Sequence, residues 1–336
     1  MSKLTGVSKI ILAAGRSTAV LSLAALWLLP VAPAAAQTTY IAVGDSVAYG
    51  YMNSTLTPVG GSGYPGYAQL YDAFLSAQAG APVTLLNLGI VGETTTSLLT
   101  HSAGNAALNS NYSASPSSSQ FALLSADLNP SITHITVQIG ANDMLGLALN
   151  PSFAYGTPAT QQALLASTLV TVQSNYNALL TQISTLDPGA DVQVLDYYNP
   201  YAALPPSTPA QPYNDYLREM SVPLLGGLNA VIAQQAALHD DSLVDLAGPF
   251  AGQESTLTRS SEYIDFGGLS VPNDHPTAAG YAVIAQQLEP AAVPEASSVV
   301  SFGLLLLLAV GGAVISAHRK PSRRKSRTSA AAPAKS

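Results

Sequence analysis

The sequence contains no cysteine, and positive charge is almost missing from its central part. Without cysteine the chain has no disulfide, no thiol nucleophile and no cysteine-ligated metal. Only Arg218 and Arg259 lie between Gln37 and Ala296, whereas all 19 aspartates and glutamates do, so that segment carries a formal charge of −17. This charge repels nucleic acid and other anionic polymers, so we expect a neutral or apolar substrate and no nucleic-acid partner. It also suggests an acidic milieu, a hypothesis that an activity optimum above pH 8 would contradict.

The N-terminus has the features of a secretory signal. Lys3, Lys9 and Arg16 precede the apolar run Ala19–Ala32, and three alanines at 34–36 offer small residues to a signal peptidase. We therefore predict a signal peptide over residues 1–36 that is cut before Gln37. An uncleaved anchor is the alternative.

A second apolar segment lies near the C-terminus. Ser297–Ala317 has 21 residues and no charge, and a cluster of arginines and lysines follows it. This length is sufficient to span a bilayer, and the basic flank is expected to stay in the cytoplasm and leave the preceding domain outside. We predict a transmembrane helix over residues 297–317 with a basic tail; a buried core helix with a solvated tail is the alternative.

The stretch Val293–Ser298, with the sequence VPEASS before the apolar span, resembles the PEP-CTERM sorting signal of bacterial exported proteins. It departs from that signal at Ala296, where the family has a second proline. The resemblance implies that residues 293–336 are a transient membrane anchor, cut near the Pro-Glu pair by a sorting transpeptidase. It also implies an exported protein at the cell surface or outside the cell.

Residues 37–292 remain as one domain, in which short apolar runs alternate with longer helical patterns. Nearly continuous apolar runs are typical of parallel strands that are buried on both faces. We predict strands over Tyr40–Val43, Val83–Leu88, Ile132–Ile139, Val192–Tyr197 and Ser242–Leu246. We predict helices over Tyr67–Ala77, Gln120–Asp127, Thr160–Leu186, Pro212–Leu238 and Thr277–Leu288. This alternation predicts a doubly wound sheet with helices on both faces, whose ligand site lies in the loops after the strands.

Ser46 follows the first predicted strand in the stretch VGDSVAYG. A serine hydroxyl becomes a nucleophile only when a base takes its proton, and the oxyanion that forms next needs fixed hydrogen-bond donors. Of the five histidines, His275 is the best candidate base, because its loop leads into a predicted helix and can present it at the rim of a cleft. Gly92, after the second predicted strand, can offer a backbone N–H, and Asn142, after the third, can offer its side-chain amide. Taken singly, an ordinary surface histidine, a turn glycine and a capping asparagine are equally good interpretations.

The four segments occur in the order Gly-Asp-Ser, a loop glycine, Gly-Ala-Asn-Asp and His-Pro, each at a predicted strand end or helix start. In this order they resemble the SGNH or GDSL hydrolase family, and the match runs over about Tyr40–Leu288. The resemblance implies a flavodoxin-like α/β/α sandwich with a five-stranded, mainly parallel sheet. It also implies esterase or lipase activity without a cofactor or metal. Ser46 is then the nucleophile and His275 the general base, while the Ser46 N–H, the Gly92 N–H and the Asn142 amide form the oxyanion hole.

The catalytic acid departs from the family pattern. The family places it three residues before the histidine, and that position is Pro272. Asp274 is the nearest carboxylate and our candidate acid. A shifted loop, Asp265, or a backbone carbonyl that accepts the Nδ1 proton and so makes a dyad, are the alternatives.

Three other functions compete with a carboxylic esterase. A carbohydrate O-deacetylase would use the same chemistry, and an association with exopolysaccharide, implied by the sorting signal, favours it. A non-catalytic polysaccharide-binding protein is favoured by the missing acid. A binuclear metallophosphoesterase needs several histidines at strand ends, which this chain lacks. The aromatic stretch Tyr197–Tyr201 is a candidate wall for an acyl or sugar site.

Overall fold

Five parallel strands form the central sheet, in the order β2-β1-β3-β4-β5. Their bounds are β1 (Thr39–Gly44), β2 (Thr84–Asn87), β3 (Ile132–Gln138), β4 (Asp191–Leu195) and β5 (Ser242–Val244). Every neighbouring pair in this sheet is parallel, and β1 lies between β2 and β3 with Ile41 opposite Leu86 and Ile135. All five predicted strands and their parallel arrangement are confirmed.

The computed structural model describes residues 38–51, 65–100, 109–112, 118–129, 132–266 and 269–292. The predicted signal peptide (1–36), the predicted sorting signal (293–336) and its transmembrane segment (297–317) lie outside the described residues. The chain divides into a unit that ends at Leu288 and a second unit from Glu289 onward. The fold and site below belong to the first unit.

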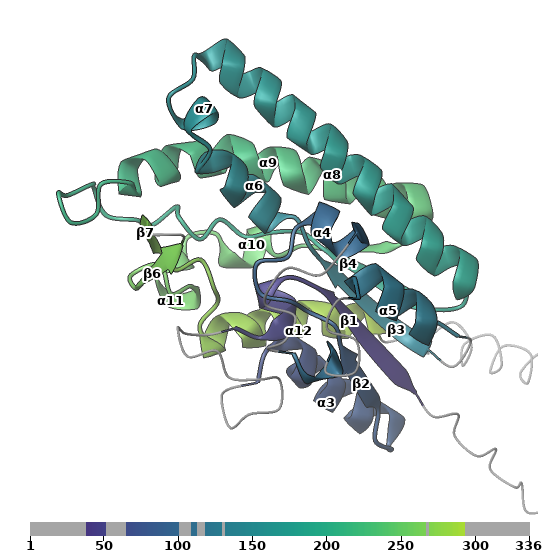
Figure 1. The fold of residues 1–336 in the computed structure, drawn as a ribbon. Helices are drawn as coiled ribbons and strands as arrows, with labels where there is room; N and C mark the ends of the chain where they lie inside the picture. Colours follow the sequence, from purple (N-terminus) through teal and green to yellow (C-terminus); the bar gives the residue numbers. More distant parts are fainter. Residues whose placement is uncertain are drawn as a thin grey trace, which may run out of the picture. The chain divides into compact units, whose positions relative to one another are not determined.

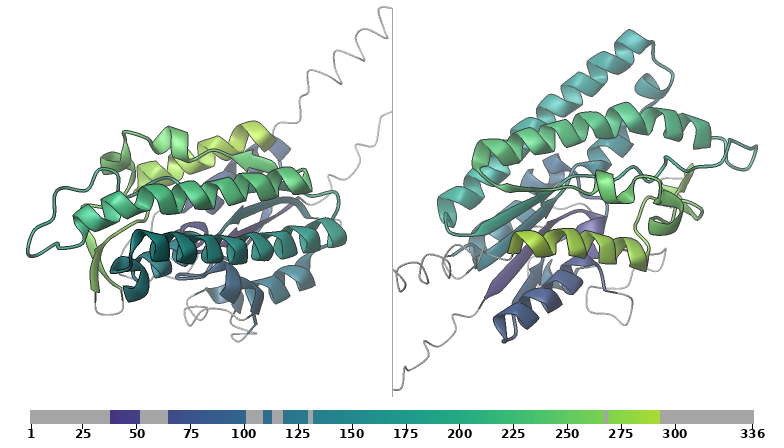
Figure 2. Two further views of the ribbon diagram at one scale, coloured as in Figure 1. Left: turned by 90° about the horizontal axis from the view of Figure 1, so that it is seen from above. Right: turned by 180° about the vertical axis from the view of Figure 1, so that it is seen from behind.

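Helices connect the strands and cover both faces of the sheet (Figures 1 and 2). They are α2 (Ser46–Tyr49), α3 (Tyr67–Ala79), α4 (Thr95–Thr100), α5 (Gln120–Asp127), α6 (Ala141–Ala148), α7 (Pro151–Ala154), α8 (Pro158–Leu186), α9 (Asn214–His239), α10 (Ala247–Phe250), α11 (Glu254–Leu257) and α12 (Ala278–Ala292), with a short 3-10 helix, η2 (Ser110–Tyr112). The five predicted helices correspond to α3, α5, α8, α9 and α12; α5 has the predicted bounds, and the ends of the other four differ by a few residues. Prolines begin α7 and α8, where the missing N–H is tolerated.

Alternate residues of each strand face opposite layers of helices. One face carries Ile41, Ile135 and Val192, which join the main hydrophobic core together with buried residues of α5, α6, α8 and α9. The other face is more polar, and the hydroxyl of Tyr40 bonds Thr136 at 2.8 Å. Helices α3 and α12 cover this second face, through Tyr67 and Tyr71 of α3 and the Leu288 carbonyl of α12, which accepts from Gln193.

Helix α9 is the one described helix that is long and apolar enough to cross a membrane by length and composition. Its buried residues, among them Leu224, Leu228 and Ile232, pack into the main core of the domain. Helix α9 is therefore part of one helical layer of the sandwich.

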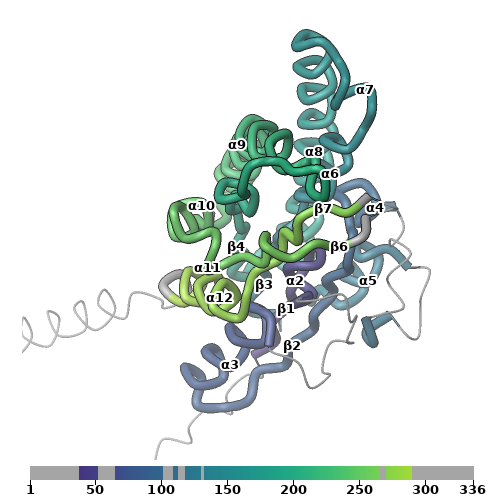
Figure 3. The backbone as a smooth tube through the Cα atoms, turned by 90° about the vertical axis from the view of Figure 1, so that its left-hand side faces the viewer, coloured from purple at the N-terminus to yellow at the C-terminus, as the bar shows by residue number. Residues whose placement is uncertain are grey.

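A second, two-stranded sheet lies on the side of the domain toward which the main strands run, at the left of Figure 1, and Figure 3 views the molecule from that side. Strand β6 (Tyr263–Phe266) pairs antiparallel with β7 (Leu269–Pro272), and Tyr263 lies opposite Pro272. The chain leaves β7 directly into the segment that contains His275. Neither strand was predicted from the sequence.

Candidate active site

Ser46 is the first residue of α2, directly after the sharp bend that ends β1. Gly44 makes this bend possible, because its φ of +152° is disfavoured for residues with a side chain, and a Cβ at this position would lie 2.0 Å from the Gln138 carbonyl oxygen. The Gln120 side chain fixes Gly44 through bonds to its N–H (2.9 Å) and its carbonyl (2.7 Å). The Ser46 hydroxyl is thus held at the carboxyl edge of the sheet.

Asp45, the residue between the bend and the serine, is buried and has a structural role. Its carboxylate caps α2 by accepting the Val47 N–H at 2.9 Å, and it accepts the Tyr197 hydroxyl at 2.6 Å. Burial raises the pKa of Asp45 to about 7, although both hydrogen bonds act in the opposite direction. The aspartate therefore connects the serine turn to the loop after β4.

His275 lies 229 residues away from Ser46 in the chain, and its Nε2 is 2.8 Å from the Ser46 Oγ. Backbone bonds hold its loop against an earlier segment: the Arg259 N–H donates to the His275 carbonyl, and the Asn273 N–H donates to the Glu262 carbonyl. Both side chains are buried, with residue exposures of 8% for Ser46 and 6% for His275. The serine and the histidine singled out in the sequence are therefore within hydrogen-bonding distance.

The other ring nitrogen of His275 has two neighbours. Its Nδ1 is 2.7 Å from the Oδ1 of Asn273, with which it forms a hydrogen bond. An Asp274 carboxylate oxygen lies 3.2 Å from the same nitrogen as a charge contact. The backbone of Asp265, the other carboxylate considered, pairs with Ser270 in the hairpin. Asn273 was not a candidate from the sequence, although asparagine side chains commonly accept a bond from the backbone two residues on.

Burial lowers the pKa of His275, and Arg259 lowers it further, whereas the charge of Asp274 acts in the opposite direction. A lowered pKa keeps the imidazole neutral at neutral pH. Only the neutral ring can accept the proton of a serine hydroxyl. The burial of the site therefore favours the form that a general base requires.

The two candidate oxyanion donors lie on neighbouring segments. Asn142, in the first turn of α6, donates one N–H of its side-chain amide to the Glu93 carbonyl at 2.9 Å, which leaves its second N–H for another acceptor. Gly92 precedes Glu93 in the loop after β2 and has a φ of +82°. Asp143 accepts both the N–H and the hydroxyl of Thr95, at 2.9 and 2.8 Å, which fixes this loop to α6. This use of Asp143 was not anticipated from the sequence.

A pocket of about 650 Å³, measured with its open mouth, begins at Ser46 and Asn142 and extends between α6 and α9. Its apolar lining comes from Met144, Leu145 and Ala148 of α6 and from Leu217, Met220, Leu224 and Leu225 of α9. Tyr197, Tyr198 and Tyr201 also line it, in agreement with the proposed role of this stretch as a wall. An apolar chain of several carbons can therefore lie next to the serine.

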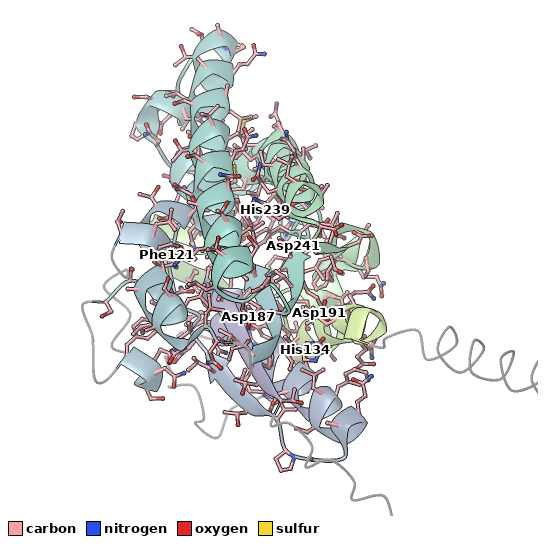
Figure 4. The ribbon with its side chains drawn as sticks, turned by 90° about the vertical axis from the view of Figure 1, so that its right-hand side faces the viewer. Phe121, His134, Asp187, Asp191, His239 and Asp241 are labelled. Atoms are coloured by element: carbon pink, nitrogen blue, oxygen red, sulfur yellow. The ribbon has the colours of Figure 1, made fainter. Side chains whose placement is uncertain are left out.

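Two other histidines lie at the amino ends of the strands, away from Ser46. Figure 4 shows His134, Asp191, His239 and Asp241 in this region. His134 Nδ1 is 3.4 Å from an Asp191 oxygen, and His239 Nε2 is 3.3 Å from Asn177. Within the described ranges, no three histidine, aspartate or glutamate side chains are grouped so that they could hold a metal ion.

The chain is similar to several solved structures. A lipase from a goat rumen metagenome shares 18% identity at a TM-score of 0.51, over 77% of this chain and 99% of that one. Phospholipase A1 from Streptomyces albidoflavus NA297 shares 21% identity at a TM-score of 0.49, over 76% of this chain and 99% of that one. An acetylxylan esterase from Geobacillus stearothermophilus shares 15% identity at a TM-score of 0.46, over 76% of this chain and 93% of that one. No curated protein matches the sequence. The similarity to the rumen lipase supports the fold alone.

The model of the GDSL-like lipase/acylhydrolase family matches residues 42–283, which include Ser46, Gly92, Asn142 and His275. This match covers more than half of the chain. The protein therefore belongs to the GDSL-like lipase/acylhydrolase family.

Proposed function

We propose that this protein is a serine esterase that cleaves carboxylic esters with an apolar acyl group through an acyl-enzyme intermediate. The observation that carries the proposal is the 2.8 Å contact between Ser46 Oγ and His275 Nε2 at the start of an apolar pocket. A nucleophile within hydrogen-bonding reach of a base, beside a space for the substrate, is the arrangement that acyl transfer needs.

In the first half of the reaction, the Ser46 hydroxyl transfers its proton to His275 Nε2 while its oxygen attacks the ester carbonyl carbon. The carbonyl oxygen becomes an oxyanion, for which we assign the Ser46 N–H, the Gly92 N–H and the free N–H of Asn142 as donors. As the first residue of a helix, Ser46 has no intrahelical acceptor for its N–H. The imidazolium then gives its proton to the leaving alkoxide, and the acyl group stays on Ser46.

In the second half, a water molecule replaces the alcohol. His275 takes one proton from this water while the hydroxide adds to the acyl carbon, and the same oxyanion donors act again. Collapse of the intermediate releases the carboxylic acid and returns the proton to Ser46 Oγ. Apart from the ester and this water molecule, the two steps use residues of this chain alone.

The pocket favours acyl esters over acetylated sugars. Aliphatic side chains and methionines of α6 and α9 line the space between these two helices, and these surfaces favour a hydrocarbon chain over hydroxyl groups. An O-deacetylase of exopolysaccharide would instead leave this space unused, because an acetyl group has a single methyl. A non-catalytic binding protein would have no need for the close approach of Ser46 and His275.

We also propose, from the sequence, that the protein is exported and held at the cell surface by the C-terminal segment before processing. The apolar segments at both ends and the basic tail support this location. Fractionation of cells that express the chain, with immunodetection of its C-terminal tail, tests the proposal. A full-length protein in the cytoplasm would contradict it.

The esterase is tested with p-nitrophenyl esters of increasing chain length, run beside acetylated xylan. Burial of each further methylene contributes about 0.8 kcal/mol, so kcat/KM should rise about fourfold per methylene until the pocket is filled. Ser46→Ala should reduce the rate by a factor on the order of 10³ or more. Equal rates for the wild type and Ser46→Ala would refute the hydrolase, and a preference for acetylated xylan would favour the deacetylase.

A pair of variants on α9 tests the pocket itself. Met220 lines the pocket, whereas Val222 is 65% exposed on the same helix and does not line it. Met220→Trp should move the preferred ester to a shorter chain and leave hydrolysis of the acetate ester nearly unchanged. Val222→Trp places the same indole side chain toward solvent and should keep the wild-type preference. The same profile for both variants would show that acyl chains bind elsewhere.

A further inference from the structure

The Nδ1 atom of His275 faces a neutral amide at hydrogen-bonding distance where a triad normally has a carboxylate. The Oδ1 of Asn273 is 2.7 Å from this nitrogen and 3.1 Å from the backbone nitrogen of His275. One side-chain oxygen thus meets both the main chain and the ring of the same histidine. Its residue is 1% exposed.

These two contacts define the orientation of the amide and the tautomer of the ring. A backbone N–H can only donate, so the Asn273 atom that faces it must be the acceptor oxygen. The same oxygen can take a second bond only from a donor, so Nδ1 must carry the proton. The Nε2 atom is then unprotonated, and it is this atom that lies 2.8 Å from Ser46 Oγ. The asparagine therefore presents the basic nitrogen of His275 to the serine.

The alternative orientation of the amide has a clear penalty. With the amide turned over, its NH₂ group would face the backbone N–H of His275, so two donors would meet. In the present orientation the NH₂ group is buried and has no hydrogen-bond partner among the described residues. The NH₂ group is thus left without a partner, whereas both hydrogen bonds from His275 to Oδ1 are made. We therefore infer that these two bonds determine the orientation of the amide.

Asp274 provides what the amide lacks, which is negative charge. Its side chain is 25% exposed, and one carboxylate oxygen lies 3.2 Å from Nδ1, beside the hydrogen-bonded direction. Its backbone carbonyl accepts the Tyr198 hydroxyl at 3.0 Å, which helps to fix this residue. Asp274 can therefore stabilise a positive charge on the ring while the Nδ1 proton stays on the bond to Asn273.

We propose that the two tasks of a triad carboxylate are divided between adjacent residues here: Asn273 is the positioning residue that holds the His275 ring and its tautomer, and Asp274 offsets the charge of the imidazolium. The inference rests on the proposed function for its kinetic consequences. The proton balance is unchanged, because one proton moves from Ser46 Oγ to Nε2 and the Nδ1 proton remains where it is.

The division predicts a particular response to pH. The titratable or charged groups around His275 are Asp274, Arg259 with its partner Glu262, and the Tyr51 ring, whose centre is 4.4 Å from that of the imidazole. An amide at position 273 adds no charge, so the base stays unprotonated to a lower pH than it would beside a second carboxylate. Asn273→Asp keeps the acceptor oxygen and adds that charge, so it should raise the acid limb of the kcat/KM profile by about one pH unit or more.

The experiment compares four variants of the purified full chain over pH 4–9. Asn273→Ala should lower kcat by a factor on the order of 10² with little change in KM, because the ring loses its orientation. Asn273→Asp should restore most of this activity with the shifted acid limb. Asp274→Asn should keep the tautomer, lower kcat by about tenfold and move the acid limb down. Asn150→Ala is the matched control: Asn150 makes the same bond to the backbone two residues on, in α7, without a histidine.

Nitrogen-15 NMR of His275 adds a measurement that does not depend on activity. The wild type and Asn273→Asp should show a single tautomer with the proton on Nδ1, whereas Asn273→Ala should show both tautomers. The proposal is overturned if Asn273→Ala keeps wild-type kcat and a single tautomer, or if Asn273→Asp leaves the acid limb in place. If the wild type is no more active than Ser46→Ala, the proposed function fails, and the NMR result still decides the role of Asn273.

Discussion

The bend at Gly44 allows the loss of stability in the variant Gly44→Ala to be estimated from the structure. In Gly44→Ala, the new Cβ would lie 2.0 Å from the Gln138 carbonyl oxygen and 2.9 Å from the carbon of the same group. Gln138 is in β3 and lies opposite Gly44 in the sheet, so neither atom can move without separating two central strands. The hydrogen bond from the Asp45 N–H to the Gln138 oxygen, at 3.2 Å, would also be lost.

Three costs add up in this variant. Overpacking against a fixed neighbour costs about 1–3 kcal/mol. A residue with a side chain in this backbone conformation costs about 1–3 kcal/mol. The lost hydrogen bond adds about 1 kcal/mol. Gly44→Ala should therefore lower the free energy of unfolding by about 3–7 kcal/mol.

Gly80→Ala separates the conformational cost from the steric one. Gly80 ends α3 with a φ of +63°, and a Cβ there would meet nothing within 4 Å. This variant should lose about 1 kcal/mol through its backbone conformation alone. Urea unfolding of both variants measures the difference, and ester hydrolysis reports whether Ser46 stays in place, since a displacement of about 1 Å can cost 10²-fold in rate. If Gly44→Ala is no less stable than Gly80→Ala and keeps full activity, the close approach does not constrain the serine turn.

Two further predictions concern buried carboxyl groups. Tyr197→Phe removes the 2.6 Å donor to Asp45 and should cost about 1–3 kcal/mol by urea unfolding, with a larger loss at pH 8 than at pH 5; equal losses would contradict the bond. Burial raises the pKa of Asp45 to about 7 and that of Asp196 to about 6, so the folded chain holds protons that an unfolded chain releases above about pH 4. The stability that these two carboxyl groups contribute at low pH should be lost as the pH rises from about 4 to 7, by a few kcal/mol in total. The lowered pKa of His275 acts in the opposite direction at pH values below the ordinary pKa of histidine. A free energy of unfolding that is unchanged or higher at pH 8 than at pH 5 would contradict this.

The central sheet was predictable because its strands are buried between two helical layers. The segment Tyr40–Val43 is then apolar throughout, as is typical of a parallel strand that is buried on both faces. Helix α5 has its predicted bounds, Gln120–Asp127, and the Ser119 side chain caps its N-terminus. The hairpin of β6 and β7 was missed, because four-residue strands outside the core carry too short a pattern to distinguish them from a loop.

The serine, the histidine and the two loops that we propose as oxyanion donors each follow a strand or precede a helix, positions that a parallel sheet brings to one edge. The partner of His275 Nδ1 is determined by the local turn between β7 and His275, which the sequence pattern did not predict. Its family position is Pro272, the last residue of β7, so a side chain from there cannot donate or accept. The chain then turns through an asparagine whose oxygen bonds the backbone two residues on, a local preference of this residue type. Because that bond places Oδ1 beside the main chain of His275, the ring needs only its own rotation to reach it, and a neutral side chain can orient the base without a carboxylate at the expected position.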